Sequence, residues 1–166
     1  MDPEEIKSLS KYGAARELVL GFARGQCTVT DPDPYYADAC RELDRRDWPT
    51  HWCGIFCLWA LHQAGLALDW QWEIGRGFLY QLAPPVLEPA AGDVAYFPNS
   101  KFGSPVQHHA IVESLDGYQL TTIDGNTNRG RFERGQVLRK SRDVRIYDPT
   151  PSYYSISSLL PKEPSK

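Results

Sequence analysis

The sequence lacks a long apolar run, a strong net charge and a basic start. A membrane-spanning helix needs about 20 consecutive apolar residues, and no stretch of the chain approaches that. The net charge of −3 gives no electrostatic reason to bind nucleic acid or an anionic membrane. The acidic first residues do not resemble a signal peptide. We therefore expect no membrane span, no nucleic-acid partner and synthesis in the cytoplasm.

The sequence also lacks a metal-binding pattern. No two of its four cysteines are separated by two residues, and no cysteine–histidine set has the spacing of a zinc finger; the cysteines are Cys27, Cys40, Cys53 and Cys57. We therefore expect neither a metal nor a cofactor. A chain of 166 residues also buries enough surface to fold without disulfide bonds.

The composition is that of one ordinary soluble domain. Hydrophobic residues make up 42% of the chain and charged residues 23%, and the length suits one domain better than two. We expect this domain to cover residues 1–150. Residues 151–166 are rich in proline and serine, so we expect a C-terminal extension that is partly disordered.

Helical signals come first along the chain and strand signals second. Periodicity and capping residues predict helices over residues 3–23, 35–46 and 51–65, with a short one over 76–82. In the first helix, Val19 and Phe22 belong to the face expected to pack inward. Alternation predicts strands over residues 94–97, 106–115, 118–124, 135–141 and 144–147, and a hairpin turn at Asp116-Gly117. This order predicts an α+β fold with an antiparallel sheet.

The helix over residues 51–65 is apolar on most of its circumference, which predicts burial in the middle of the domain. Cys53 lies in its first turn, where free backbone N–H groups and the helix dipole favour a thiolate. Cys57 lies one turn further in, where the dipole helps less. We therefore expect Cys53 to be a nucleophile and Cys57 to be a packing residue.

A cysteine nucleophile needs a base, and the strand over residues 106–115 offers His108 and His109. Adjacent residues of a strand point to opposite faces, so we expect only one of the two to meet Cys53. Asp124 and Asn126 end the next strand, where a carboxylate or carboxamide could orient the imidazole. A strict two-residue turn at Asp116-Gly117 would place His109 opposite Asp124, whereas a bulge or a longer loop would favour His108.

Four short segments resemble the CHAP family, the cysteine- and histidine-dependent amidohydrolases and peptidases. They are WCGIFCLWALHQAGL from Trp52, GDVAYF from Gly92, HHAIVESLDG from His108 and TIDGNTN from Thr122. They occur in the family's order over residues 52–128. The resemblance implies a papain-like cysteine hydrolase fold with N-terminal helices, a buried nucleophile helix and an antiparallel sheet. Within the second segment, we expect Asp93 to order the loop before its strand.

The resemblance implies Cys53 as the nucleophile and His108 as the base, because the family's histidine stands two residues before a small residue, here Ala110. Asp124 and Asn126 occupy the positions that orient or polarise the histidine. Asp124 stands where the family more often has glutamate, so either the loop closes more tightly or Asn126 is the main orienting partner.

The resemblance further implies a peptidoglycan hydrolase that cleaves an amide bond in the stem peptide, in a cross-bridge or between muramic acid and L-alanine. Such an enzyme would act in the periplasm or cell wall after delivery, as an antibacterial effector or a phage enzyme. Its expected partners are peptidoglycan or muropeptides, delivery machinery and an immunity protein. The alternatives are a toxin domain that cleaves or deamidates a protein, and a non-catalytic module that binds wall fragments or a partner.

Overall fold

A computed structural model describes residues 3–44, 52–70, 77–82, 84–98, 107–127 and 135–159. Its α-helices are α1 (Pro3–Gly25), α2 (Asp33–Leu43) and α3 (Cys53–Gln63), and its 3-10 helices are η1 (Gly77–Gln81), η2 (Val144–Ile146) and η3 (Ile156–Leu159). Its strands are β1 (Pro85–Val86), β2 (Val94–Phe97), β3 (His108–Asp116), β4 (Gln119–Thr127), β5 (Gln136–Asp143) and β6 (Ser152–Tyr154). The α+β prediction is confirmed.

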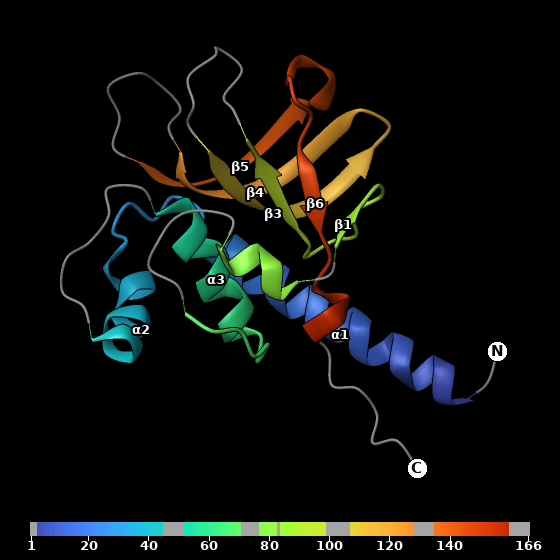
Figure 1. The fold of residues 1–166 in the computed structure, drawn as a ribbon, viewed down its shortest axis with the longest axis horizontal. Helices are drawn as coiled ribbons and strands as arrows, with labels where there is room; N and C mark the ends of the chain where they lie inside the picture. The colour runs from blue at the N-terminus through green and yellow to red at the C-terminus, as the bar shows by residue number, and fades with distance from the viewer. Residues whose placement is uncertain are drawn as a thin grey trace.

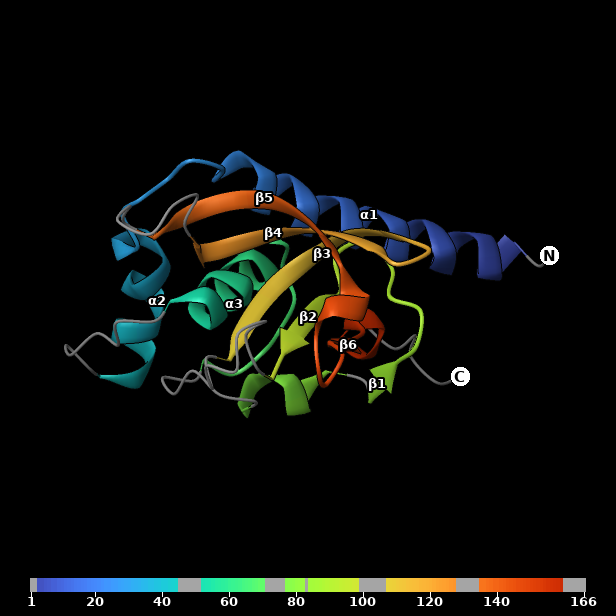
Figure 2. The ribbon, with the colours of Figure 1, turned by 90° about the horizontal axis from the view of Figure 1, so that it is seen from above.

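The six strands form one sheet in the order β1-β6-β2-β3-β4-β5, and every neighbouring pair is antiparallel. The helix α3 lies between α1 and α2 and packs against β3 and β4 (Figure 1). Seen from above, β3 and β4 cross over α3 (Figure 2). Among the described residues, no helix is both long and apolar enough to cross a membrane.

The position of α3 follows from its sequence, since nearly every residue in it is apolar and eight of its residues are buried. Phe56 is fully buried and contacts Tyr35 of α2 edge to face, with ring centroids 5.3 Å apart. Tyr35 also stacks on Trp52, the residue before α3. These aromatic contacts fix the start of α3 against α2, and burial of such rings supplies much of a domain's hydrophobic stabilisation.

The opposite face of the sheet carries a second, smaller core. Its buried members come from the alternate positions of the strands, as the period of two requires; they are Ala95, Phe97, Ala110, Val112, Leu120 and Tyr153. The sheet is therefore covered on both faces around β2 and β3, which fixes the register of these strands.

Asp93 connects the start of β2 to two distant segments. Its carboxylate accepts hydrogen bonds from Arg16 of α1 at 2.6 Å and from the backbone N–H groups of Ala90 and Ile156 at 2.8 and 3.0 Å. The residue is 1% exposed, so the ion pair with Arg16 lies inside the protein. The expectation that Asp93 orders the loop before its strand is confirmed.

Several expected elements differ from the structure. Residues 144–146 form the 3-10 helix η2 rather than a strand, because the side chain of Asp143 accepts the N–H of Arg145 and starts a turn. In α1, Val19 is buried as expected, but Phe22 is 36% exposed and the buried face runs instead through Leu20 and Ala23.

The sheet also continues beyond the expected boundary at residue 150. The strand β6 lies between β1 and β2, and its residues Tyr153 and Tyr154 are both 7% exposed. Neither β1 nor β6 was expected, because two- and three-residue strands carry no alternating pattern. Residues 45–46, 51, 76, 106 and 160–166, which belong to the expected helices, strand and extension, lie outside the described residues.

Candidate active site

Cys53 is the first residue of α3 and is 2% exposed. The first helical hydrogen bond runs from Phe56 N–H to the carbonyl of Trp52, so the N–H groups of Cys53, Gly54 and Ile55 have no partner within the helix. The side chain of Trp52 makes no capping hydrogen bond. This helix start therefore presents N–H donors and a positive dipole end at the thiol.

Two imidazoles surround this thiol. Cys53 Sγ lies 3.8 Å from Nδ1 of His109. Burial raises the pKa of Cys53, but hydrogen bonds with His108 and His109 and their charges outweigh it, so the pKa lies well below its ordinary value. The arrangement thus favours a thiolate at Cys53.

The two histidines point to opposite faces of β3, as strand alternation requires. The ring of His109 lies over Tyr96, with centroids 5.1 Å apart, and Tyr96 belongs to the core under α3. The ring of His108 lies 6.0 Å from that of Phe97, which belongs to the second core. The printed contact with the sulfur comes from His109, and a hydrogen bond and the charge of His108 also contribute to the lowered pKa of Cys53.

A β-bulge determines which histidine shares a face with Asp124. The hairpin turn is Gly117-Tyr118, since Asp116 pairs with Gln119. The register then shifts between Val112 and Ser114, which leaves Glu113 as the extra residue. Ile111 pairs with Ile123, so continuing this register places His108 on the same face as Asp124.

Glu113 holds the bulge by two ion pairs. One of its carboxylate oxygens lies 2.7 Å from Arg24 of α1, and the other contacts Arg139 of β5. Its side chain is only 8% exposed. Burial raises the pKa of Glu113, but the hydrogen bonds from Arg139 and Arg24 outweigh it and lower the pKa. The extra residue of β3 is thus tied to α1 and to β5.

His108 contacts Asp124 directly. Its Nε2 lies 2.7 Å from Oδ2 of Asp124, and its side chain is 22% exposed whereas that of Asp124 is fully buried. Burial lowers the pKa of His108, but the hydrogen bonds with Asp124 and Cys53 outweigh it and raise the pKa to about 10. At neutral pH this imidazole is therefore protonated.

Asp124 is held by two further groups that sequence reasoning missed. Arg142 of β5 reaches its Oδ2 at 2.5 Å, and the hydroxyl of Thr122 donates to its Oδ1 at 2.5 Å. Burial raises the pKa of Asp124, but the charge of Arg142 and the hydrogen bond with His108 lower it far below its ordinary value. The carboxylate is therefore ionised although no part of it is exposed.

Asn126 has a backbone role in the structure. Its φ is +52°, a conformation that asparagine tolerates better than most residues, and the pairing of β4 with β5 shifts between Asp124 and Thr127 around it. Its amide oxygen lies against Gly135, where a β-carbon would come within 2.2 Å. Asn126 thus shapes the end of β4 and packs towards β5.

Gly125 allows β4 to approach α3 closely. A β-carbon at this position would lie 2.6 Å from Cβ of Phe56, a separation that real atoms do not adopt. Phe56 lies three residues after Cys53. The absence of a side chain at Gly125 therefore sets the distance between the helix that carries the thiol and the strand that carries Asp124.

Cys57 is fully buried, and burial together with the charges of Cys53 and Asp124 raises its pKa well above the ordinary value. This thiol stays protonated, in agreement with its expected packing role. Among the described residues, no group of three or more histidine, cysteine or acidic side chains could hold a metal ion.

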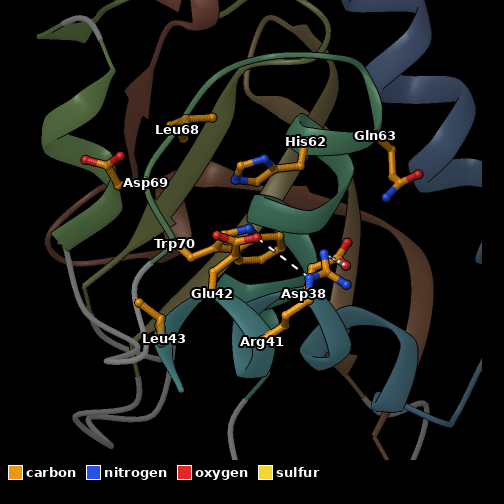
Figure 3. A pocket seen from close by; sticks show the side chains of 9 residues that line it. All are labelled: Asp38, Arg41, Glu42, Leu43, His62, Gln63, Leu68, Asp69 and Trp70. Atoms are coloured by element: carbon orange, nitrogen blue, oxygen red, sulfur yellow. Dashed lines mark hydrogen bonds and ion pairs between the residues drawn. The ribbon is translucent and has the colours of Figure 1, made fainter. Parts of the chain in front are cut away.

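A separate pocket of about 550 Å³ lies between α2 and the C-terminal end of α3 (Figure 3). In it, His62 stacks on Trp70 with centroids 4.3 Å apart, and its Nε2 is buried with no hydrogen-bond partner in the described part of the chain. Cys53 lies at the other end of α3, about 14 Å away at 1.5 Å per residue. This pocket is therefore not the site of the thiol.

Residues 45–126 match the family model of the CHAP domain. No curated protein matches the chain. The matched segment includes Cys53, His108, Asp124 and Asn126, so the resemblance stated from the sequence is confirmed for this part of the chain. CHAP domains have the papain-like cysteine hydrolase fold, and the family comprises cysteine- and histidine-dependent amidohydrolases and peptidases, generally related to the cell wall.

Proposed function

Because residues 45–126 match the family model of the CHAP domain, we propose that the protein is a cysteine amidase or endopeptidase that hydrolyses an amide bond of peptidoglycan. Cys53 is the nucleophile, His108 exchanges protons with the reacting groups, and Asp124 orients His108. One observation carries this assignment: the thiol at the start of α3 has a lowered pKa, and His108, one of the two histidines that lower it, is held by a buried carboxylate.

The first half-reaction starts from a thiolate and an imidazolium, since the pKa of Cys53 is lowered and that of His108 is raised to about 10. The thiolate attacks the amide carbonyl carbon and forms a C–S bond. The free N–H of Cys53 at the helix start donates to the resulting oxyanion. His108 then gives its proton to the amide nitrogen, the C–N bond breaks, and the amine leaves a thioester on Cys53.

The second half-reaction returns the enzyme to its resting state. Neutral His108 takes a proton from water, and the hydroxide attacks the thioester carbonyl. The C–S bond breaks, the carboxylic acid product leaves, and the thiolate and imidazolium are restored. Asp124 stays ionised throughout and accepts the Nε2–H of His108, which leaves Nδ1 of that ring to exchange protons with the reacting groups.

The test is the release of soluble fragments from purified sacculi. The wild-type protein should release them, and Cys53→Ala should abolish release. The matched control is Cys57→Ala, which removes a thiol from the next turn of the same helix and should keep activity if the protein folds. Mass spectrometry of the fragments would identify the bond as one in the stem peptide, in a cross-bridge or between muramic acid and L-alanine.

Two other outcomes identify the alternatives. Intact sacculi together with a rapidly alkylated Cys53 would favour an enzyme that cleaves or deamidates a protein. Intact sacculi together with slow alkylation of both thiols would favour a non-catalytic binding module, and either outcome would overturn the proposed substrate.

The proposed place of action is the periplasm or cell wall, reached through delivery machinery, with an immunity protein protecting the producer. This proposal follows from a peptidoglycan substrate. It predicts that bacteria tolerate the protein in the cytoplasm but lyse when it is directed to the periplasm. Lysis by the Cys53→Ala variant, or survival with the wild type in the periplasm, would contradict it.

A further inference from the structure

Arg142 is a second cationic partner of the carboxylate that holds His108. Its Nη2 lies 2.5 Å from Oδ2 of Asp124, the same oxygen that contacts Nε2 of His108 at 2.7 Å. Its Nη1 lies 3.3 Å from the other oxygen of Asp124. The guanidinium therefore spans both carboxylate oxygens, which is the geometry in which arginine pairs most strongly with a carboxylate.

The guanidinium is fixed on its other sides as well. Its carbon lies 5.0 Å from the centre of the Phe97 ring, and its Nη1 donates to the hydroxyl of Thr122 at 2.5 Å. Since the Thr122 proton goes to Asp124, the three groups close a ring of hydrogen bonds. Tyr147 adds another hydrogen bond to Arg142. The side chain of Arg142 is 13% exposed, so water contributes little to holding it.

Burial of Asp124 makes this partner necessary. A carboxylate with no exposed surface takes up a proton unless cations or hydrogen-bond donors compensate its lost hydration. The titratable groups that face Asp124 are Arg142 from β5, His108 from β3 and Cys57 from α3. Cys57 stays neutral, and His108 changes charge during the proposed reaction. Arg142 is the one permanent cation among these described groups.

We propose that Arg142 is a positioning residue of the hydrolase: it keeps Asp124 ionised and fixed, so that Oδ2 accepts the Nε2–H of His108 at every stage of the reaction. This proposal rests on the proposed function. Arg142 acts through Asp124 and His108 and does not touch the thiol. A neutral Asp124 could rotate and donate its own proton, which would release the imidazole from its orientation.

The test compares Arg142→Gln and Arg142→Lys with wild type by two readouts. The first is the ¹⁵N NMR titration of His108 in histidine-labelled protein. The second is the pH profile of Cys53 alkylation by iodoacetamide. The matched control is Arg145→Gln, because Arg145 also forms an ion pair with an aspartate, Asp143 at the end of β5, but lies on the surface, 62% exposed.

In Arg142→Gln, Asp124 should take up a proton at a higher pH, because the charge that lowers its pKa is gone. The His108 resonances should then show an additional inflection at acidic pH, and alkylation of Cys53 should be about 100-fold slower there, the scale expected for a misplaced catalytic group. Arg142→Lys should fall between the two, since lysine keeps the charge but not the two-pronged contact. Arg145→Gln should match wild type.

A wild-type titration of His108 in folded Arg142→Gln would overturn the proposal, even if that variant melts at a lower temperature. If Arg142→Gln does not fold, Arg142→Lys decides, and a wild-type titration and alkylation rate in that variant would overturn it. The NMR readout does not depend on peptidoglycan. Intact sacculi would therefore remove the proposed substrate without deciding the role of Arg142.

Discussion

Cys53 and Cys57 lie one turn apart on α3, and the pKa values of their thiols are displaced in opposite directions. Both side chains are buried, so burial alone cannot produce the difference. The difference comes from the hydrogen bonds and charges of the imidazoles, which lower the pKa of Cys53, and from the charges of Cys53 and Asp124, which raise that of Cys57. The same helix therefore carries one reactive and one inert sulfur.

This difference predicts selective alkylation at neutral pH. Near pH 7 an ordinary thiol with a pKa of 9.0 is about 1% thiolate, and the lowered pKa of Cys53 gives it a larger thiolate fraction. The lower intrinsic nucleophilicity of a low-pKa thiolate offsets part of this gain, so we expect Cys53 to react about 10-fold faster than an ordinary thiol. Peptide mapping after brief iodoacetamide treatment measures the relative alkylation of the four cysteines. Equal slow labelling of Cys53 and Cys57 would contradict the assignment.

The two histidines should contribute unequally to hydrolysis. His108→Ala removes the proton carrier that Asp124 holds, so kcat/KM should fall by about 10²–10⁴-fold. His109→Ala leaves the His108–Asp124 pair intact and removes the contact of the His109 ring with the sulfur at 3.8 Å. We therefore expect kcat/KM to fall by only about 10-fold. Fragment release from sacculi measures both. A larger loss in His109→Ala would transfer the role of base to His109.

The order of the two pKa values predicts the pH profile. The active thiolate–imidazolium pair forms as the pH rises through the lowered pKa of Cys53, and it is lost when His108 loses its proton at about pH 10. In Asp124→Asn, the anion that raises the pKa of His108 is absent, so the alkaline limb should move to lower pH. Initial rates of hydrolysis across pH measure this limb. An unchanged alkaline limb would show that Asp124 does not act on His108.

Gly125→Ala should weaken both stability and activity. The added methyl group would overlap Phe56, and overpacking of this kind costs about 1–3 kcal/mol of unfolding free energy. Relief of the overlap moves α3 away from β4 and thereby separates Cys53 from its partners. The matched control is Gly21→Ala, because nothing lies within 4 Å of a β-carbon there. Chemical denaturation and sacculus digestion of both variants give the comparison, and wild-type values for Gly125→Ala would refute the close approach.

Asp93→Asn should destabilise the fold without changing the pKa of Cys53. The substitution leaves Arg16 without its charge partner at a site where the aspartate is 2% exposed and the arginine 17% exposed. Breaking a buried ion pair costs about 3–5 kcal/mol. Asp143→Asn is the control, since its ion pair with Arg145 is on the surface and should contribute nothing measurable. Urea denaturation decides, and equal stability of the two variants would contradict the prediction.

The helix start and its nucleophile could be predicted from local sequence, because an apolar helix and a cysteine in its first turn need no knowledge of distant residues. The strand at residues 94–97 was likewise predicted with the bounds of β2. The turn was expected one residue early, since Asp116-Gly117 and Gly117-Tyr118 both use the glycine. Its φ of +55° at the first turn position selects the second arrangement.

Arg142, the second charged partner of Asp124, could not be predicted in the same way. Arg142 lies 18 residues away on β5, and its contact with Asp124 depends on the register between β4 and β5. Register follows from turn geometry and bulges, which a single sequence specifies weakly. Arg142 is thus a largely buried ion-pair partner of Asp124. Nothing in the local sequence around Arg142 distinguishes it from the exposed arginines of the chain.

The bulge at Glu113 determines which of the two histidines lies on the same face of the sheet as Asp124. If β3 and β4 paired without interruption from the same turn, every residue of β3 before the bulge would move by one position, and His109 would take the face that His108 now occupies. Removal of residue 113 would instead keep the present pairing of β3 with β4, in which Ile111 lies opposite Ile123. The choice between two adjacent imidazoles therefore depends on one extra strand residue, four positions from His109 and five from His108. A single inserted residue in this hairpin would change the chemistry without altering any residue of the site.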